Sequence, residues 1–433
     1  MNLTEINLLY GGETLRIRRF AGITDATIKL SRMNVFIGPQ ASGKSVCAKL
    51  IFYFRERVNR LFWLLTANGN DAASDDEERR NFNALFPPLK RGEGKFRLEY
   101  SFGDIQMTVV QDPYARDFLR IEYSHQWSSL KNSLRRLRST LFKSVPRGIP
   151  APHIEGELWA AISRHLTSRG AASLANPCCF APAERGLTLS LRHFVPLLKT
   201  ADVVTKPLLI TLARRYAITR SLYTAQDTPS DRREIMTQAQ IARILGAKFE
   251  IVGVEETLIL EDGTPIPLDQ ASYGQQVAFP LLLMLAATGR NERWSQHTTF
   301  FVEEPEAHLY PTAQREMVHL LCTALDLTSR KSLSQCVLTT HSPYILTALN
   351  NLMYGAKAIR ENPDCTERIR KILGETDLVL PEHVRAYAFT NGTITSIIDD
   401  ETGLVLAREL DSVSGMLADE FHQIMDARYG DDE

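Results

Sequence analysis

The sequence predicts an α/β fold in which helices flank a mixed central sheet, and three observations lead to this prediction. A short buried strand, Met33–Ile37, ends in a glycine-rich turn that an amphipathic helix follows. Two further runs, Thr298–Val302 and Cys336–Thr340, consist of β-forming residues with almost no polar interruption, which is typical of parallel strands covered on both faces. From residue 272 onward, helical and strand patterns alternate, as they do when helices cover a sheet.

Length and composition restrict the class of protein. The chain has 433 residues, of which 44% are hydrophobic and 23% charged, so it is a globular protein with enough chain for two or three domains. Its longest apolar stretch, Val277–Thr288, is far shorter than the roughly 20 residues that cross a bilayer, which excludes an integral membrane protein. The N-terminus lacks the order of a secretory signal, so we expect a cytoplasmic location.

The six cysteines show neither a CxxC pair nor metal-ligand spacing with histidine. We expect them to be reduced and mostly buried, as is usual inside cells. They are Cys47, Cys178, Cys179, Cys322, Cys336 and Cys365.

The first part of the chain, 1–125, contains the glycine-rich turn. The segments LRIRRF and ATIKL predict two short strands before it, and residues 95–110 predict a hairpin. The polar stretch 68–81 is interpreted as a solvated loop. After the turn, apolar residues recur at steps of three and four and predict one buried helix face: Cys47, Leu50, Ile51, Phe54, Val58, Leu61 and Phe62.

The second part, 126–246, has a helical pattern and a strong positive charge, and we interpret it as a basic helical insertion. Residues 131–230 carry fifteen lysines and arginines against five acidic residues, a net charge of +10, whereas the whole chain carries −1. The third part, 247–433, begins with strands at 248–253 and 256–268, the second of which turns at Asp262-Gly263. A small β piece at 386–399 and a helix near Ser412 complete it.

The glycine-rich turn reads GPQASGKS and matches the phosphate-loop pattern G-x-x-x-x-G-K-[ST], in the strand and helix context that this pattern requires. Successive backbone N–H groups of such a loop point at phosphate oxygens, and the helix N-terminus adds partial positive charge. Lys44 is predicted to reach the β- and γ-phosphates, and Ser45 to offer its hydroxyl to Mg²⁺. ATP and Mg²⁺ are therefore the expected ligands of Gly38, Pro39, Gln40, Ala41, Ser42, Gly43, Lys44 and Ser45.

Two acids, Glu303 and Glu304, follow the strand Thr298–Val302 and precede Pro305. Ligands of parallel sheets bind beyond the carboxyl ends of the strands, so this pair is expected beside the phosphate loop. We predict that Glu303 holds Mg²⁺ and that Glu304 is the base that polarises the attacking water. His341 follows the next buried strand, where its imidazole can contact the γ-phosphate or that water.

A further phosphate-binding surface is predicted at residues 272–275. Ser272, Gly274 and Gln275 begin a helix that is apolar nearly all round, which indicates a buried helix. Its N-terminus can bind an anion, yet the phosphate loop already provides one γ-phosphate site, so the surface implies the nucleotide of a partner subunit. The alternative is that Ser272 simply caps a core helix.

In this order, at residues 38, 272, 303 and 341, the motifs resemble an ABC-type P-loop ATPase head of the SMC-like branch. Stand-alone ATPases of the overcoming-lysogenization-defect group carry similar EEPEAHL and THSPYIL motifs. The resemblance covers Leu15–Leu61 and about 270–354. It implies ATP held between subunits of a homodimer or higher homo-oligomer, with Ser272, Gly274 and Gln275 acting in trans and residues 306–308 contacting the neighbouring subunit.

The sequence departs from the family pattern at several places. It has ASYGQQ where transporter domains have LSGGQ, and Glu303 where aspartate is commoner. The glutamine that senses Mg²⁺ is not identifiable, with Gln111 and the Pro182–Arg185 segment as candidates. The candidates for contacting adenine are Arg18, Arg19 and Phe20.

Two functional hypotheses follow. The 92 residues after His341 are too few for the nuclease domain of larger relatives, so the chain resembles the ATPase subunit of two-gene anti-phage systems such as Septu and PARIS. It would act as a sensor that holds or releases a separate effector, a toxin or nuclease. The alternative is a DNA-binding SMC-like ATPase of repair or recombination, in which phosphates are contacted by arginines of the basic segment, namely Arg135, Arg136, Arg138, Arg214 and Arg215.

Overall fold

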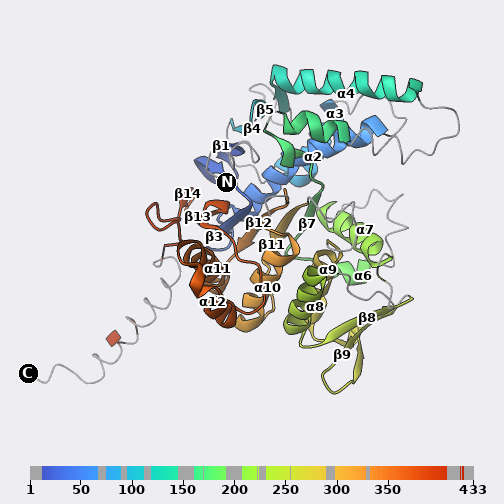
Figure 1. The fold of residues 1–433 in the computed structure, drawn as a ribbon. Coiled ribbons are helices and arrows are strands. Elements are labelled where there is room, and N and C mark those ends of the chain that lie inside the picture. Colours follow the sequence, from blue (N-terminus) through green and yellow to red (C-terminus); the bar gives the residue numbers. More distant parts are fainter. Residues whose placement is uncertain are drawn as a thin grey trace, which may run out of the picture.

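The fold is built around one mixed sheet that extends across the middle of the molecule (Figure 1). The computed structural model describes residues 12–66, 75–88, 95–111, 119–144, 160–168, 170–191, 207–221, 223, 231–253, 255–288, 298–327, 332–406, 420 and 422–423. Six strands form the sheet, in the order β14 (Thr393–Ser396), β13 (Val384–Thr390), β3 (Met33–Ile37), β12 (Gln335–Thr340), β11 (Thr299–Glu303) and β7 (Cys178–Ala181). The five strands from β13 to β7 are parallel, and β14 pairs antiparallel with β13. The predicted mixed α/β fold is confirmed.

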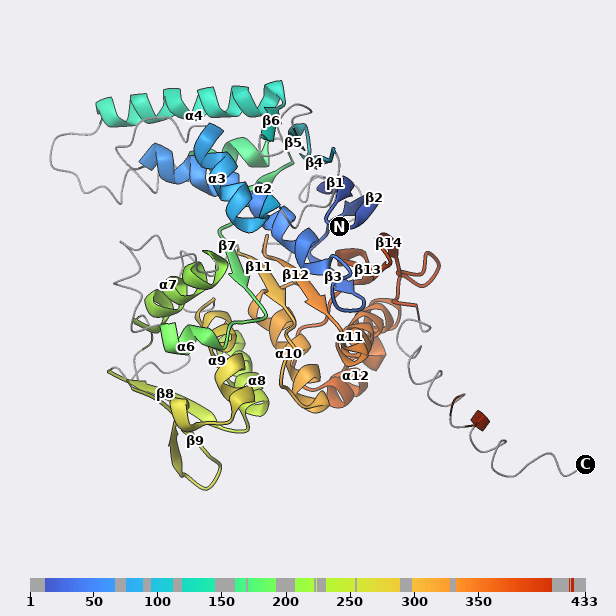
Figure 2. The same ribbon diagram turned by 180° about the vertical axis from the view of Figure 1, so that it is seen from behind.

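Alternating strand residues point into two separate cores, one on each face of the sheet. Phe300 and Val302 of β11 belong to one core, whereas Phe301 between them belongs to the other. Both faces of the strand are covered, which explains why the residues between Thr299 and Glu303 are all apolar. The first core is formed by helices on one side of the sheet (Figure 2): α8 (Arg232–Leu245), α9 (Tyr273–Ala287), α10 (Pro311–Ala324) and α11 (Pro343–Glu361).

The second core lies between the central sheet and an antiparallel sheet, with α2 (Lys44–Thr66) between them (Figure 1). Cys47, Leu50, Ile51 and Phe54 of α2 are buried there as predicted, while the side chains predicted at 58, 61 and 62 lie outside the described residues. The antiparallel sheet has the order β2 (Ile23–Lys29), β1 (Thr14–Phe20), β4 (Arg97–Phe102), β5 (Ile105–Gln111) and β6 (Leu119–Tyr123).

One expectation about this region is wrong. Residues from 75 onward, within the stretch interpreted as a solvated loop, form α3 (Asp75–Leu85). Phe82 of this helix is fully buried and packs against Phe20 of β1, with ring centroids 6.0 Å apart. Phe82 and, less deeply, Leu85 thus attach a very polar helix to the second core. The polar residues before them have the composition of a solvated loop, so the sequence did not indicate a helix.

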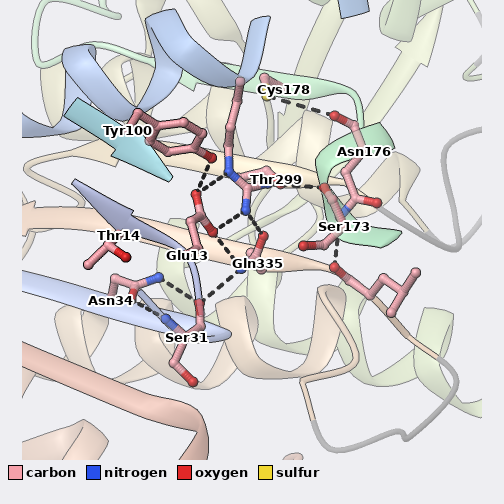
Figure 3. A network of polar contacts seen from close by, with 12 residues as sticks. Glu13, Thr14, Ser31, Asn34, Tyr100, Ser173, Asn176, Cys178, Thr299 and Gln335 are labelled. Carbon is pink, nitrogen blue, oxygen red and sulfur yellow. Dashed lines mark hydrogen bonds and ion pairs between the residues drawn. The ribbon is translucent and has the colours of Figure 1, made fainter. Parts of the chain in front are cut away.

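A buried polar network joins the phosphate-loop helix to both sheets (Figure 3). The Arg55 guanidinium of α2 forms an ion pair with Glu13 at 2.5 Å and donates to Thr299 Oγ1 at 2.8 Å. It also donates to Gln335 Oε1, and Tyr100 Oη donates to Glu13 Oε1 at 2.6 Å. Desolvation acts against the charge of Arg55, but the Glu13 carboxylate outweighs it and keeps the pKa of Arg55 above its ordinary value. Breaking such a buried pair by removing one partner costs about 3–5 kcal/mol.

The segment 126–246 contains the expected helices, but it is not helical throughout. The described residues of this segment include α4 (His125–Ser144), a helix over 160–167, α6 (Leu187–Leu191), α7 (Pro207–Ser221) and α8. Between α4 and α6, however, the chain contributes β7, the edge strand of the central sheet, which pairs with β11. A run of four apolar residues inside a helical pattern does not by itself predict a strand. These residues are extended because they pair with β11. The three-part division of the chain stays a prediction.

The C-terminal part matches the sequence closely. The strands predicted at 248–268 form β8 (Lys248–Val252), β9 (Glu255–Ile259) and β10 (Pro265–Pro267), with Gly263 at φ +85° in the turn. After α11 come α12 (Thr366–Leu373) and the 3-10 turn η6 (Pro381–His383). The helix expected near Ser412 lies outside the described residues. Five cysteines are buried and Cys365 is half-buried, as predicted. Within the described residues, no helix has the length and apolar character needed to cross a membrane.

Candidate functional site

The loop between β3 and α2 has the backbone of a phosphate loop. Gly38, Ala41 and Gly43 have φ values of +151°, +58° and +102°, and these positive values curl the loop back on itself. A Cβ at Gly38 would lie 2.3 Å from the carbonyl oxygen of Phe389 in β13, so only glycine fits there. The pattern predicted from the sequence therefore has its structural counterpart: a glycine-dependent loop between a central strand and a helix.

Lys44 and Ser45, the first two residues of α2, lie at the inner edge of this curl. The Lys44 ammonium donates to the carbonyl oxygens of Gly38 at 2.8 Å and Pro39 at 2.7 Å. Burial lowers the pKa of Lys44, while the negative charges of Glu304 and Glu306 act in the opposite direction. The loop thus holds the Lys44 ammonium close enough to feel the negative charges of Glu304 and Glu306. A lysine beside carboxylates is a combination that phosphoryl transfer uses.

Glu303 is the last residue of β11 and is buried at 3% exposure. Its Oε2 accepts a hydrogen bond from the N–H of Ala183 at 3.2 Å, and its Oε1 lies 3.7 Å from the Lys49 ammonium of α2. Oε1 is buried and accepts no hydrogen bond. Burying a carboxylate oxygen that accepts no hydrogen bond is costly, so a second cation besides Lys49 would stabilise Oε1.

That oxygen fits Mg²⁺. Mg²⁺ is commonly held by one or two protein oxygens together with phosphate oxygens and water, so Glu303 and the Ser45 hydroxyl are a sufficient protein set. When bound, the ion neutralises charge on the β- and γ-phosphate oxygens.

Glu304 and His341 meet at the same edge of the sheet. The N–H of Glu304 donates to the carbonyl oxygen of Thr339 in β12 at 2.8 Å, which joins the ends of the two strands. Nε2 of His341 lies 3.5 Å from Oε1 of Glu304, and both side chains are partly exposed. Glu304 has φ +47°, an unusual value for a residue other than glycine. A carboxylate and an imidazole thus lie side by side beyond two parallel strands, and their catalytic roles stay a prediction.

Arg185 contributes to this edge in a way that the sequence did not reveal. It lies in the Pro182–Arg185 segment after β7, is fully buried, and donates to the carbonyl oxygens of Glu303 at 2.7 Å and Glu304 at 2.9 Å. Burial lowers its pKa to about 10, opposed by the nearby glutamates. Its position depends on β7, the strand missing from the sequence prediction. Of the two candidates for Mg²⁺ sensing, this segment reaches the acidic strand end, whereas Gln111 ends β5 in the other sheet.

Ser272, Gly274 and Gln275 form the N-terminus of α9. The Ser272 hydroxyl accepts from the N–H of Gln275, and the Gln275 side chain accepts from the N–H of Ser272, a complete capping box. Gln275 Nε2 also donates to the Leu245 carbonyl at 2.7 Å. These hydrogen bonds remain within α9 and the end of α8, and Ser272 itself is exposed. The core-helix cap that was the alternative interpretation is therefore present, and the outer surface of the cap stays accessible.

The loop of Glu306, Ala307 and His308 packs against this helix end. A Cβ at Gly274 would lie 2.5 Å from the His308 carbonyl oxygen, and the rings of Tyr273 and His308 are 4.7 Å apart at 73°. On its other side, Glu306 Oε1 accepts from the N–H of His341 at 2.7 Å. The loop thus connects the histidine of the site to the start of α9.

One candidate for contacting adenine is wrong. Phe20 is fully buried and packs edge-on against Phe86 and Phe96, with centroids 5.5 and 4.8 Å away. A ring enclosed in the second core cannot stack on a base. Arg19 is exposed and Arg18 half-buried at the end of β1, and both remain candidates.

The arginines proposed to contact DNA do not form one patch. Arg136 of α4 and Arg214 of α7 are exposed, whereas the other three, Arg135, Arg138 and Arg215, are half-buried. Figures 1 and 2 place α4 and α7 on different levels of the molecule, separated by α2 and α3. The two exposed arginines among the proposed DNA contacts therefore lie in separate regions.

Comparison with known proteins identifies a family. The family described as "AAA domain, putative AbiEii toxin, Type IV TA system" matches residues 52–347. Two solved structures are similar over 89% of this chain. One, an SMC head bound to the C-winged helix domain of ScpA, has 9% identity, 96% coverage of its own chain and a TM-score of 0.42. The SMC head domain from Thermotoga maritima has 12% identity, 97% coverage and a TM-score of 0.36. No curated protein matches the chain.

Proposed function

Because this chain belongs to the AAA domain family that is described as putative AbiEii toxin, Type IV TA system, we propose that it binds ATP with Mg²⁺ and hydrolyses it to ADP and phosphate. The observation that carries the proposal is the meeting of Lys44, Glu303, Glu304 and His341 at one end of the central sheet. Three segments that are far apart in sequence meet there: Lys44 supplies the cation, the adjacent Glu303 and Glu304 supply the proposed metal ligand and base, and the third segment supplies His341.

In the proposed mechanism, the phosphate-loop N–H groups and Lys44 bind the β- and γ-phosphates of ATP. Glu304 accepts a proton from a water molecule, whose oxygen bonds to the γ-phosphorus as the bond to the bridging oxygen of ADP breaks. His341, 3.5 Å from Glu304, orients this water or contacts the γ-phosphate. Glu303 and Ser45 would hold Mg²⁺, which would offset the negative charge of the phosphates.

We further propose that two copies of the chain complete each other's sites. The hydrogen bonds of Ser272 and Gln275 stay within their own subunit, which leaves the exposed end of α9 for another nucleotide. Helix N-termini favour anions, and Ser272 adds a hydroxyl. A homodimer with ATP between the phosphate loop of one copy and α9 of the other uses both surfaces.

The association of two copies would then act as a switch that holds or releases a separate toxin or nuclease in anti-phage defence. The family description names a putative toxin and a Type IV TA system, which supports a link to such systems. The alternative is an SMC-like ATPase of DNA repair or recombination, supported by the positive charge of 131–230. We favour the first because the exposed arginines of α4 and α7 lie in separate regions.

One variant tests these proposals together. Glu304→Gln keeps the shape of the side chain but removes the base, so it is expected to bind ATP normally and to lose hydrolysis by about 10²–10⁴-fold. ATP should trap it as a dimer in light scattering. Hydrolysis at the wild-type rate would show that Glu304 is not the base.

The same variant, expressed with its neighbouring genes and purified in ATP, distinguishes the two functions. Mass spectrometry of a stoichiometric second protein would establish the effector-holding function and name the effector. Copurification of nucleic acid alone, lost when Arg136 and Arg214 are changed to Glu, would establish the DNA-binding alternative.

A further inference from the structure

The backbone of Glu304 is strained, and neighbouring groups must hold it in place. Its φ of +47° lies in the left-handed region, which is unfavourable for a residue with a side chain. Outliers of this kind persist only where the surroundings fix them. Three hydrogen bonds act on its peptide groups: its N–H donates to Thr339, and its carbonyl oxygen accepts from Arg185 Nη2 at 2.9 Å and from the Ala307 N–H at 3.0 Å.

Of the three partners in these hydrogen bonds, Arg185 is the one that takes part through its side chain. Its second terminal nitrogen donates to the Glu303 carbonyl at 2.7 Å, so one rigid guanidinium spans two consecutive peptide groups. A buried arginine ordinarily pairs with a carboxylate, because burying an unpaired charge is costly. Here a fully buried guanidinium directs these bonds to main-chain carbonyls at the point where β11 ends.

The neighbouring residues of Arg185 act on the same two glutamates. Two residues earlier, the N–H of Ala183 donates to Glu303 Oε2 at 3.2 Å. The segment after β7 therefore fixes the Glu303 carboxylate through its backbone and the Glu303 and Glu304 carbonyls through a side chain. No sequence motif of the nucleotide site includes these contacts.

We propose that Arg185 is a positioning residue for ATP hydrolysis: its guanidinium holds the peptide between Glu303 and Glu304 in the strained conformation that directs the Glu304 carboxylate toward His341. The proposal rests on the function proposed above, in which Glu304 is the base. Arg185 touches neither nucleotide nor water in this role and acts through the backbone. Lysine cannot replace it fully, because a single ammonium lacks the planar fork that reaches two carbonyls at once.

The test compares Arg185→Lys with a matched control. Arg32 is also buried, at 1% exposure, and its Nη2 donates to two main-chain carbonyls, those of Asp326 at 3.0 Å and Ser332 at 2.9 Å, at the opposite end of β3. Arg32→Lys therefore reproduces the loss of stability without touching the acidic strand end. ATP affinity is measured with a fluorescent analogue, and kcat by phosphate release.

We expect Arg185→Lys to change ATP affinity by less than about twofold and to lower kcat by at least tenfold, as for misplacement of a catalytic group. Arg32→Lys should keep the wild-type kcat. In the Glu304→Gln background, Arg185→Lys should lower the residual rate no further, because the base through which it acts is gone. Equal losses of kcat in both arginine variants, or additive losses with Glu304→Gln, would overturn the proposal. Should the lysine variant be insoluble, Arg185→Gln takes its place.

A crystal structure of the Arg185 variant decides the proposal independently of hydrolysis. Relaxation of Glu304 to negative φ supports it, and an unchanged φ near +47° contradicts it. A wild-type protein that hydrolyses no ATP would instead contradict the proposed function, and the φ of Glu304 in the variant would still report whether Arg185 holds this backbone.

Discussion

Lys44 is the residue on which nucleotide binding is expected to depend. We predict that Lys44→Ala weakens ATP binding by about 10- to 150-fold, because a hydrogen bond to a charged group contributes about 1.5–3 kcal/mol. The ammonium that now donates to Gly38 and Pro39 is then missing from the curl of the loop. Titration calorimetry measures the change.

Lys248→Ala is the control for this prediction, since Lys248 is an exposed lysine of β8 in a different sheet. It should bind ATP like the wild type. Undiminished affinity of Lys44→Ala would show that the loop is not the phosphate site.

At the scale of single residues, the motifs in the sequence named most of the candidate site in advance. Lys44, Glu304 and His341 belong to short patterns whose chemistry is recognisable without a structure, and the structure places them together. The sequence singled out the Pro182–Arg185 segment only as a candidate for sensing Mg²⁺, and the role of Arg185 could not be found in this way. Its contribution is a pair of hydrogen bonds to main-chain carbonyls, and carbonyls carry no sequence signal.

At the scale of elements, two helices begin with comparable caps and provide a matched comparison. Asp231 caps α8 by accepting from the Glu234 N–H at 2.8 Å, and Ser272 caps α9 by accepting from Gln275. Replacing either by alanine is expected to cost about 1 kcal/mol of stability. Only Ser272→Ala should also reduce ATP hydrolysis, because only that cap is predicted to contact a nucleotide.

Chemical denaturation and phosphate release measure the two effects of these variants. If Ser272→Ala loses stability but hydrolyses ATP as fast as Asp231→Ala, the serine is a cap and nothing more. A selective loss of hydrolysis supports the contact in trans.

The elements that the sequence predicted well are those whose local pattern agrees with their packing. β3 was predicted with its observed bounds, and β11 and β12 to within one residue at either end, because each is a short apolar run with polar flanks. β7 and α3 escaped prediction for opposite reasons. β7 is an apolar run inside a helical pattern, while α3 is so polar that, of its described side chains, Phe82 is the one that is fully buried.

At the scale of the whole molecule, two buried histidines should make stability depend on pH. His383 is 6% exposed and His319 is 2% exposed; burial, aided by nearby arginines, lowers the pKa of each to about 4. An unfolded chain has histidine pKa values near 6.5, so below about pH 6.5 it binds protons that the folded chain does not. Stability is therefore fully present above pH 6.5 and falls toward pH 4.

The expected loss is about 3 kcal/mol per histidine once both transitions are complete. Urea unfolding of wild type and His383→Asn at pH 7.5 and 4.5 measures it. The variant should show a pH effect smaller by about 2–3 kcal/mol, whereas His125→Asn, at the exposed start of α4, should behave like the wild type. Equal pH effects in all three proteins would contradict the prediction.

The Arg55 network has a consequence for alignment within the molecule. Thr299 and Gln335, which contact Arg55, are the first residues of β11 and β12, and Glu304 and His341 directly follow the last residues of these strands. Arg55 itself is in the same helix as Lys44. One guanidinium therefore fixes the starting positions of both strands relative to α2. The number of residues in each strand then determines where Glu304 and His341 lie relative to Lys44. A slip of a single residue in either strand would displace a catalytic side chain by about 3.3 Å.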